Sequence, residues 1–288
     1  MHPEGFAMSA RTGLLGVIGH PVGHSLSPRL HNAALRSQGV DLVYLAFDVE
    51  PVQLSAAVSG LRALGVRGAN VTVPHKEAVV AMLDQLDPMA ARVGAVNTIV
   101  NDSGRLIGHN TDVHGFAAAL RCLLPDGARG LRCVVAGAGG AARAVVAALI
   151  ADGAARITIC NRTLERAVEL CRVAQNWGPP GCAAVPQEES RTLLADADLL
   201  VNATAVGLSL DVKDFPLPVD TLHSGLVVVD VVYGTEPTAL VQAARQRGAR
   251  AMDGVEMLLM QAGCSYRLWT GLEPPIGVMR ESMELEEG

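Results

Sequence analysis

Two short polar runs contain the residues of this chain that are best suited to acid–base chemistry. They are Asn70-Val71-Thr72-Val73-Pro74-His75-Lys76 and Asn110-Thr111-Asp112, and each ends an apolar segment that is predicted to be a strand. A strand that stops at ionisable groups mounts them on a rigid element. Lys76 and Asp112 are therefore predicted to form a catalytic pair, in which the lysine gives a proton to an oxygen that becomes negative.

A third run has the pattern of a phosphate-binding turn. Gly137, Gly139 and Ala142 occupy the three small positions of G-x-G-x-x-G, directly after a predicted strand and before a predicted helix. Small residues let the backbone N–H groups of the helix N-terminus approach a pyrophosphate. The alternative is a tight strand-to-helix turn that binds nothing. The residues expected at the cofactor are Gly137, Ala138, Gly139, Gly140 and Ala141.

The end of the following strand indicates which nicotinamide cofactor is used. An NAD site usually places an acidic side chain there, whereas this chain has Asn161-Arg162-Thr163 and then Arg166. Guanidinium groups bind a phosphate dianion bidentately, so NADP is the predicted cofactor. The alternative is a pair of solvated arginines at the start of a helix.

The chain alternates short predicted strands and helices, a pattern typical of parallel sheets covered on both faces. Ser27 is expected to be the N-cap of the first helix, with Pro28 at its first helical position. Strands are expected at 13–18, 43–49, 69–73, 133–136, 156–160, 199–202, 227–232 and 249–252. Helices are expected at 28–37, 52–64, 116–123 and 141–150.

These elements predict an α/β protein of two α/β domains. The first, 12–112, is a substrate-binding domain with a mainly parallel sheet, and the second, 113–254, is a Rossmann-like NADP-binding domain. The remaining stretch, 255–288, lacks the strand rhythm, so its helices are expected to pack back onto the first domain.

Composition excludes several other classes of protein. The chain has 288 residues, half of them hydrophobic, and a formal net charge of -6, which gives no basic surface for nucleic acid. Its six cysteines include no C-x-x-C pair, and no metal site is expected from His24, His31 and His75, whose spacing fits no zinc pattern. No stretch approaches the roughly 20 apolar residues of a membrane span, so a cytoplasmic protein is expected, as a monomer or homodimer.

Further motifs resemble those of the shikimate dehydrogenase family. The opening run Gly19 to Pro28, followed by His31-Asn32, is similar to the first motif of that family. The other similar motifs, in family order, are Asn70 to Lys76, Gly94 to Thr98, Asn110 to Asp112, Asn161 to Thr163, Asn202 to Thr204, Asp230 to Tyr233, and Asp253-Gly254 with Met257-Leu258 and Gln261. The resemblance covers almost the whole chain.

The resemblance implies NADPH-dependent, reversible reduction of 3-dehydroshikimate to shikimate, a step of aromatic amino-acid biosynthesis. It implies that Ser25 and Ser27 bind the substrate carboxylate and that Lys76 and Asp112 are catalytic, with Tyr233 positioning the substrate. It also implies contacts to the ring hydroxyls from Asn70, Thr72, Asn97, Thr111, Asp112 and Gln261. Thr204 and Gly254 join the expected cofactor site.

One departure from the family pattern keeps alternatives open. The family usually has a proline two residues after the tyrosine of this late loop, whereas here Tyr233 is followed by Gly234 and Thr235. Preference for quinate or aminoshikimate on the same scaffold is therefore an alternative. A sensor that binds NADP and substrate without turnover is a second one, which the intact Lys76 and Asp112 argue against.

Overall fold

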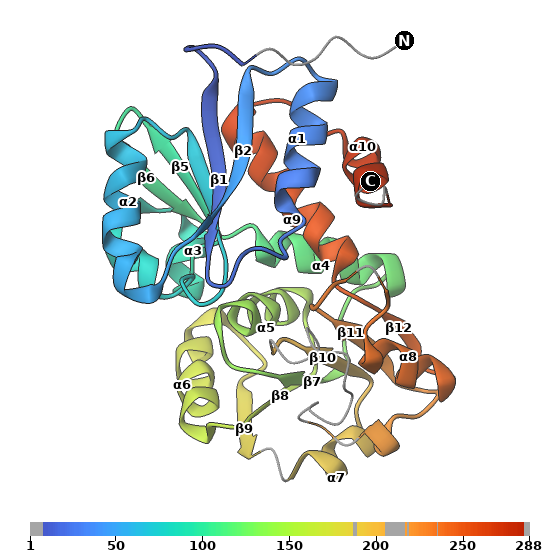
Figure 1. The fold of residues 1–288 in the computed structure, drawn as a ribbon. Coiled ribbons are helices and arrows are strands. Elements are labelled where there is room, and N and C mark those ends of the chain that lie inside the picture. The colour runs from blue at the N-terminus through green and yellow to red at the C-terminus, as the bar shows by residue number, and fades with distance from the viewer. Residues whose placement is uncertain (1–7, 187–188, 205–216, 218, 235, 285–288) are drawn as a thin grey trace. The chain divides into compact units, whose positions relative to one another are not determined.

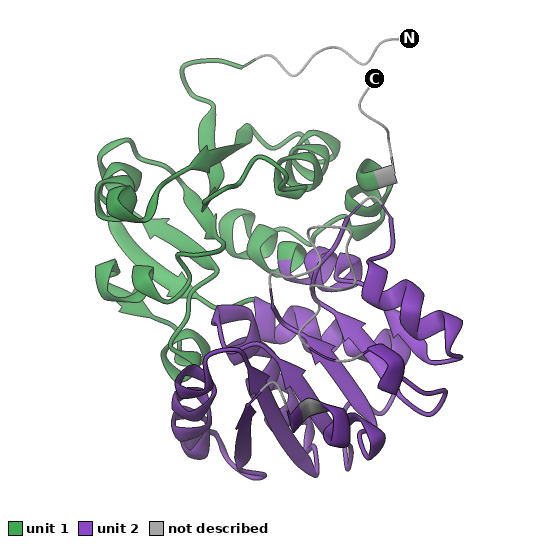
Figure 2. Ribbon diagram, turned by 60° about the horizontal axis from the view of Figure 1, so that its bottom comes forward, with its two compact units in different colours: residues 1–111, 262–288 green, residues 112–261 purple. Residues whose placement is uncertain are grey.

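The computed structural model describes residues 8–186, 189–204, 217, 219–234 and 236–284 (Figure 1). The chain divides into two compact units, residues 1–111 with 262–288 and residues 112–261 (Figure 2). The chain passes between the units at residues 111–112 and again within one helix at residues 261–262. Each unit contains one six-stranded sheet.

The sheet of the first unit is mixed. Its order is β2-β1-β3-β5-β6-β4, with β1 parallel to β2 and β3, and β5 antiparallel to both β3 and β6. The hairpin of β5 and β6 was not predicted, and it supplies the antiparallel part of a sheet that was expected to be mainly parallel. The strands are β1 (Gly13–Gly19), β2 (Leu42–Asp48), β3 (Gly68–Val71), β4 (Gln85–Leu86), β5 (Thr98–Asp102) and β6 (Arg105–His109).

Side-chain alternation along β3 divides the first unit into two different faces. Ala69 and Val71 point into an apolar core that also contains residues of α2 and α3, whereas Asn70 points to the opposite face. That opposite face carries buried residues of α1 and α9. The helices are α1 (Ser27–Ser37), α2 (Leu54–Ala63), α3 (Pro88–Val93), α10 (Ile276–Glu284) and the short 3₁₀ segments η1 (Pro51–Gln53) and η2 (Ala78–Met82).

The sheet of the second unit is entirely parallel, in the order β12-β11-β10-β7-β8-β9. Its central strands are buried on both faces, because consecutive residues such as Val134 and Val135 are both inaccessible. This confirms the predicted Rossmann-like sheet. The strands are β7 (Arg132–Ala136), β8 (Arg156–Asn161), β9 (Cys182–Pro186), β10 (Leu199–Asn202), β11 (Val227–Asp230) and β12 (Arg250–Met252).

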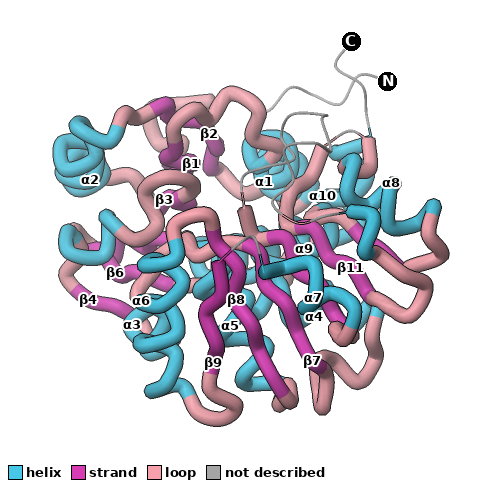
Figure 3. Tube along the Cα trace, turned by 90° about the horizontal axis from the view of Figure 1, so that it is seen from below, coloured by secondary structure: helices cyan, strands magenta, loops and turns pink. Residues whose placement is uncertain are grey.

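Helices cover this second sheet (Figure 3). Leu194 of α7 and Leu240, Val241 and Ala244 of α8 pack against Val134, Leu200 and Val228 of the sheet in one apolar core. The helices are α4 (Asp112–Leu123), α5 (Gly140–Asp152), α6 (Leu164–Ala174), α7 (Ser190–Ala195) and α8 (Ala239–Gln246), with η3 (Gln175–Trp177) and η6 (Val219–Thr221). Helix α9 (Val255–Thr270) begins in this unit and ends in the first.

The helix start at Ser27 differs from the prediction by one residue. Ser27 is the first helical residue, Leu26 holds the N-cap position, and no side chain caps the helix there. Instead, the Ser25 hydroxyl accepts a hydrogen bond from the Ser27 backbone N–H at 3.3 Å. The hydroxyl of Ser27 is therefore not needed as a cap.

Two further observations bear on the predicted class. In the first unit, α10 packs on α1, and Tyr266 and Trp269 of α9 are buried in the same unit, which confirms that the last helices return to the first domain. Within the described part of the chain, no helix has the length and apolar character that a bilayer crossing requires.

Candidate active site in two halves

A network of buried polar side chains lies at the carboxyl ends of β3 and β6 in the first unit. Asn97 joins Thr111, because its Nδ2 donates to Thr111 Oγ1 at 2.9 Å and its Oδ1 accepts from the Thr111 N–H at 2.7 Å. Asn70 Nδ2 donates to the Asn97 carbonyl oxygen at 3.1 Å. Three of the predicted substrate-binding residues are thus held together, all nearly inaccessible.

Three members of this network were not predicted. Thr98 Oγ1 lies 2.8 Å from Ser265 Oγ and 3.1 Å from Asn70 Nδ2, and the Tyr44 hydroxyl donates to Asn70 Oδ1 at 2.6 Å. Ser265 lies one helical turn after Gln261 on α9, so the i, i+4 spacing was the available signal. Tyr44 is far away in sequence, and only strand pairing brings it near Asn70.

The loop after β3 holds Lys76 by its backbone. The Lys76 carbonyl oxygen accepts from Val96 N–H at 2.8 Å, and the preceding His75 is anchored by a hydrogen bond between its Nε2 and the Val49 carbonyl oxygen at 2.7 Å. His75 is buried, whereas Lys76 and Thr72 are half-buried. Lys76 is therefore mounted on a tied loop, as its position after a strand predicts.

An aromatic stack lies beside this network. His31 stacks on Tyr44 with ring centroids 4.4 Å apart, faces Tyr266 at 6.5 Å, and meets Trp269 edge-on at 5.3 Å. Both His31 ring nitrogens are buried without a hydrogen-bond partner among the described residues. Burial lowers the pKa of His31 from 6.5 to about 3. The nearby polar side chain of Asn70 raises this pKa by a smaller amount, so the ring is neutral.

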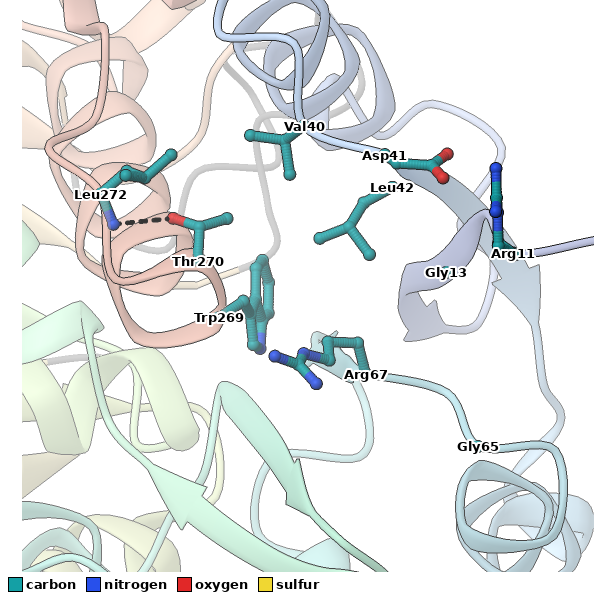
Figure 4. A pocket seen from close by; sticks show the side chains of 10 residues that line it. All are labelled: Arg11, Gly13, Val40, Asp41, Leu42, Gly65, Arg67, Trp269, Thr270 and Leu272. Carbon is teal, nitrogen blue, oxygen red and sulfur yellow. Dashed lines mark hydrogen bonds between the residues drawn. The ribbon is translucent and has the colours of Figure 1, made fainter. Parts of the chain in front are cut away.

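A surface hollow of about 390 Å³ in the first unit is lined by Trp269 of this stack but by none of the predicted site residues (Figure 4). Its walls include Gly13 and Leu42, which begin β1 and β2, and Arg67, which precedes β3. The hollow therefore occupies the amino ends of the three strands. Asn70 lies near the carboxyl end of β3 and Lys76 follows that end, where ligands of open α/β sheets bind, so this hollow is not the predicted substrate site.

In the second unit the glycine run forms the turn between β7 and α5, next to the strand pair where chain order reverses. Gly137 has φ of 110°, and a Cβ there would lie 2.8 Å from the Ala203 carbonyl oxygen. Gly139 is the N-cap of α5, and a Cβ on it would meet nothing within 4 Å. One glycine is thus required by the turn, and the other leaves open space at a helix N-terminus, the kind of position that binds phosphate groups in such folds.

The predicted 2'-phosphate contacts follow β8. Asn161 Nδ2 donates to the Thr163 carbonyl oxygen at 2.8 Å, and this bond shapes the turn into α6, whose N-cap is Thr163. Arg162 and Arg166 are both exposed and come from this turn and from the first turn of α6. Two guanidinium groups thus face solvent close to the end of β8.

A second buried network joins the ends of β10 and β11. Asp230 accepts from Asn202 Nδ2 at 2.8 Å, from Thr238 Oγ1 at 2.7 Å and from Val232 N–H at 3.0 Å. Asn202 Oδ1 in turn accepts from Thr204 Oγ1 at 2.7 Å. Burial raises the pKa of Asp230 to about 6 although the three donors favour its charged form. This network ties the loops that carry Thr204 and Tyr233.

The other predicted residues of the second unit take structural positions that suit their types. Asp112 is buried at the first turn of α4, where the helix dipole favours a carboxylate. Gln261 is buried on α9, and its Nε2 donates to the Leu258 carbonyl oxygen at 2.9 Å. A Cβ at Gly254 would lie 2.2 Å from the Val231 carbonyl oxygen, so close backbone packing already requires glycine there. Thr235 lies outside the described residues.

The described residues include no group of three or more His, Cys, Asp or Glu side chains arranged to hold a metal ion. His31 and His75 serve the packing of the first unit, as described above, and His24 is exposed.

A parallel sheet with a glycine-rich turn at its switch point, joined to a unit with buried hydroxyl and amide groups, defines the class of dinucleotide-dependent oxidoreductases that act on small polar molecules. Comparison with known proteins narrows this class. Three family models match: the shikimate dehydrogenase substrate binding domain (residues 17–99), shikimate / quinate 5-dehydrogenase (124–231) and the shikimate 5'-dehydrogenase C-terminal domain (254–284).

Relatives agree with these models. The NADP(+) shikimate dehydrogenase of Moorella thermoacetica is 48% identical over 98% of this chain and 97% of its own length. The solved shikimate 5-dehydrogenase of Thermus thermophilus, in complex with NADP(H) and shikimate, is 40% identical with a TM-score of 0.82, covering 94% of this chain and 98% of that one. The quinate dehydrogenase of Corynebacterium glutamicum, in complex with NAD, is 35% identical with a TM-score of 0.84, covering 94% and 98%. The chain belongs to the shikimate dehydrogenase family, which confirms the resemblance in its motifs.

Proposed function

We propose that this chain catalyses the reversible NADPH-dependent reduction of 3-dehydroshikimate to shikimate. The observation that carries the proposal is the buried network of Asn70, Asn97 and Thr111 beside Lys76. A polyol acid needs several fixed donors and acceptors to be held away from water, and this network offers them on rigid strand ends. The NADP(+) shikimate dehydrogenases among its relatives support the same substrate and cofactor.

The chain's own residues fit NADP. Nicotinamide supplies or accepts the hydride when the cofactor is bound. The open space at Gly139 and the N–H groups of α5 suit the pyrophosphate, and Arg162 and Arg166 suit the 2'-phosphate. Gly137, Ala138, Gly140, Ala141, Asn161, Thr163, Thr204 and Gly254 complete the proposed cofactor site.

Lys76 and Asp112 are the proposed catalytic residues. Reduction of a ketone leaves negative charge on its oxygen, and the Lys76 ammonium stabilises that charge and gives the proton to it. In the oxidation direction Lys76 starts as the neutral amine and accepts the proton of the alcohol, directly or with Asp112 as its partner. Ser25 and Ser27 hold the carboxylate of the substrate. The ring is held by Asn70, Thr72, Asn97, Thr111, Asp112 and Gln261, with Tyr233 as a positioning group.

An assay of nicotinamide absorbance separates this function from its alternatives. Purified protein is incubated with NADP+ or NAD+ and with shikimate, quinate or aminoshikimate. The proposal expects the highest kcat/KM with shikimate and NADP+. A higher value with quinate and NAD+ supports the quinate alternative, which the similarity to a quinate dehydrogenase keeps worth testing. Binding without reduction of either cofactor indicates a sensor and overturns the proposal.

Location in the cytoplasm, the choice between monomer and homodimer, and the domain limits 12–112 and 113–254 stay predictions. Size-exclusion chromatography with light scattering tests the oligomeric state.

A further inference from the structure

Three side chains that are not expected to touch the substrate contact the Asn70 amide. Its Oδ1 accepts from the Tyr44 hydroxyl at 2.6 Å, and its Nδ2 lies 3.1 Å from Thr98 Oγ1 and 3.1 Å from Ser265 Oγ. We infer that Tyr44 and Ser265 are positioning residues, which lock the Asn70 amide in one orientation and make it a pure hydrogen-bond acceptor toward the substrate.

The orientation follows from the partner at the backbone. Asn70 Nδ2 lies 3.1 Å from the Asn97 carbonyl oxygen, which only accepts, so the amide nitrogen and not its oxygen must face it. The two amide hydrogens then serve three acceptors, Asn97 O, Thr98 Oγ1 and Ser265 Oγ, and both are used within the protein. Oδ1 has two lone pairs, and the Tyr44 hydroxyl takes one. The nearby His31 ring does not take the other, because neither of its nitrogens makes a hydrogen bond among the described residues, so this second lone pair is what Asn70 offers a ligand.

Tyr44 is itself fixed at both ends. It lies on β2, the edge strand of its sheet, and Asn32 of α1 pairs with its free backbone groups: Asn32 Nδ2 donates to the Tyr44 carbonyl oxygen at 2.8 Å and Asn32 Oδ1 accepts from the Tyr44 N–H at 2.9 Å. Its ring stacks on His31, with an interplanar angle of 16°. The chain is poor in aromatic residues, and the stack contains two of its three tyrosines.

An acceptor-only Asn70 selects the part of the substrate that it contacts. A ring hydroxyl donates to Oδ1, whereas the ketone of the oxidised substrate has no hydrogen to donate and meets lone-pair repulsion. Asn70 therefore favours a hydroxyl that remains a hydroxyl in both substrate and product. The reacting oxygen is thereby directed to a donor, which Lys76 supplies. This inference rests on the proposed contact between Asn70 and the substrate.

Four variants test the inference by their KM values for shikimate and for NADP+. Asn70→Ala removes the contact itself. Tyr44→Phe and Ser265→Ala each leave the contact residue in place but remove one group that orients it. Asn70→Ala is expected to raise the KM for shikimate the most. Tyr44→Phe is expected to raise it about tenfold and Ser265→Ala about threefold, and these two variants should keep kcat and the KM for NADP+ within about twofold of wild type.

Tyr266→Phe is the matched control. Tyr266 belongs to the same stack and is equally buried, but its hydroxyl donates to Gln38 Oε1 at 2.7 Å and not to Asn70. It is expected to lower the thermal stability about as much as Tyr44→Phe while leaving the KM for shikimate unchanged. A set of monodeoxy shikimates adds a second readout: the Tyr44→Phe penalty should disappear with the one analogue that lacks the hydroxyl bound by Asn70.

The outcomes separate the two levels of the hypothesis. If Asn70→Ala leaves the KM for shikimate unchanged, the proposed substrate contact is wrong. If Asn70→Ala raises it and Tyr44→Phe does not, or if Tyr266→Phe raises it equally, the contact stands and the positioning role of Tyr44 is wrong.

Discussion

The two units prepare their parts of the reaction in different ways. In the first unit the functional groups are buried side chains that hold one another, as Asn70, Asn97 and Thr111 do. In the second unit the turn after β7 offers backbone N–H groups and open space, and Arg162 and Arg166 are exposed. Interlocked side chains read the pattern of hydroxyls on a small substrate. Backbone groups suit the pyrophosphate that NAD and NADP share, and the exposed cations suit the 2'-phosphate that only NADP carries.

The difference predicts which substitutions disturb chemistry, cofactor choice or stability. Substitutions in the first unit should act on shikimate and leave the cofactor alone, and those around α6 should do the reverse.

The largest effect is expected for Lys76. The chain has only two lysines, Lys76 and Lys213, among 23 basic residues, so an amine at this position is unlike the arginines used elsewhere. Lys76→Ala should lower kcat by about 10²–10⁴-fold with little change in the KM for shikimate, because proton transfer is lost. Steady-state kinetics in both directions measures this.

Lys76→Arg is the control for charge. It keeps a cation, but arginine stays protonated at ordinary pH and so cannot accept the proton of the alcohol. The variant should therefore be nearly as inactive in shikimate oxidation as Lys76→Ala. Near-normal turnover of either variant removes Lys76 from the mechanism.

A smaller effect is expected for Arg162. Arg162→Ala should raise the KM for NADP+ about 10–100-fold, because a hydrogen bond between charged groups contributes about 1.5–3 kcal/mol, while the KM for NAD+ stays nearly constant. Arg172→Ala is matched to it: this exposed arginine lies on α6, the helix that follows Arg162, pairs with Glu169 and should leave both values unchanged. An equal loss with NAD+ would contradict the 2'-phosphate contact.

The smallest effects are expected on the pH dependence of stability. The buried His31 of the first unit and the buried Asp230 of the second change the stability in opposite directions as the pH rises. His31 has a pKa of about 3 when folded and 6.5 otherwise, so the unfolded chain binds more protons and stability falls as the pH is lowered from 6.5. Asp230 has a raised pKa of about 6 instead of 3.8, so the folded chain binds more protons and stability falls as the pH rises from 4 to 6. Each slope is about 1.4 kcal/mol per pH unit.

Denaturant unfolding from pH 4 to 7 resolves the two contributions. Relative to wild type, His31→Phe should gain free energy of unfolding as the pH is lowered below 6.5, and Asp230→Asn should gain it as the pH rises from 4 to 6. If either difference from wild type is flat across this range, the corresponding buried group does not titrate as described.

Much of the fold followed from local pattern. The strand at Leu199–Asn202 was predicted with its observed bounds, the helix that ends at Ser37 was predicted with its observed end, and the apolar runs of the second unit indicated strands buried on both faces. The hairpin of β5 and β6 was missed, because Thr98–Asp102 and Arg105–His109 are short, half-polar and without clean alternation.

Sequence by itself determined the family and the glycine-rich turn and selected the candidate residues for the chemistry, because these depend on residue type at fixed spacing along the chain. Only the tertiary structure decided which groups hold the Asn70 amide. Tyr44 and Ser265 lie 26 residues before it and 195 residues after it, and no periodicity links such distances. The physical reason is that hydrogen-bond satisfaction of a buried amide depends on where other elements pack, which strand order and helix placement settle together.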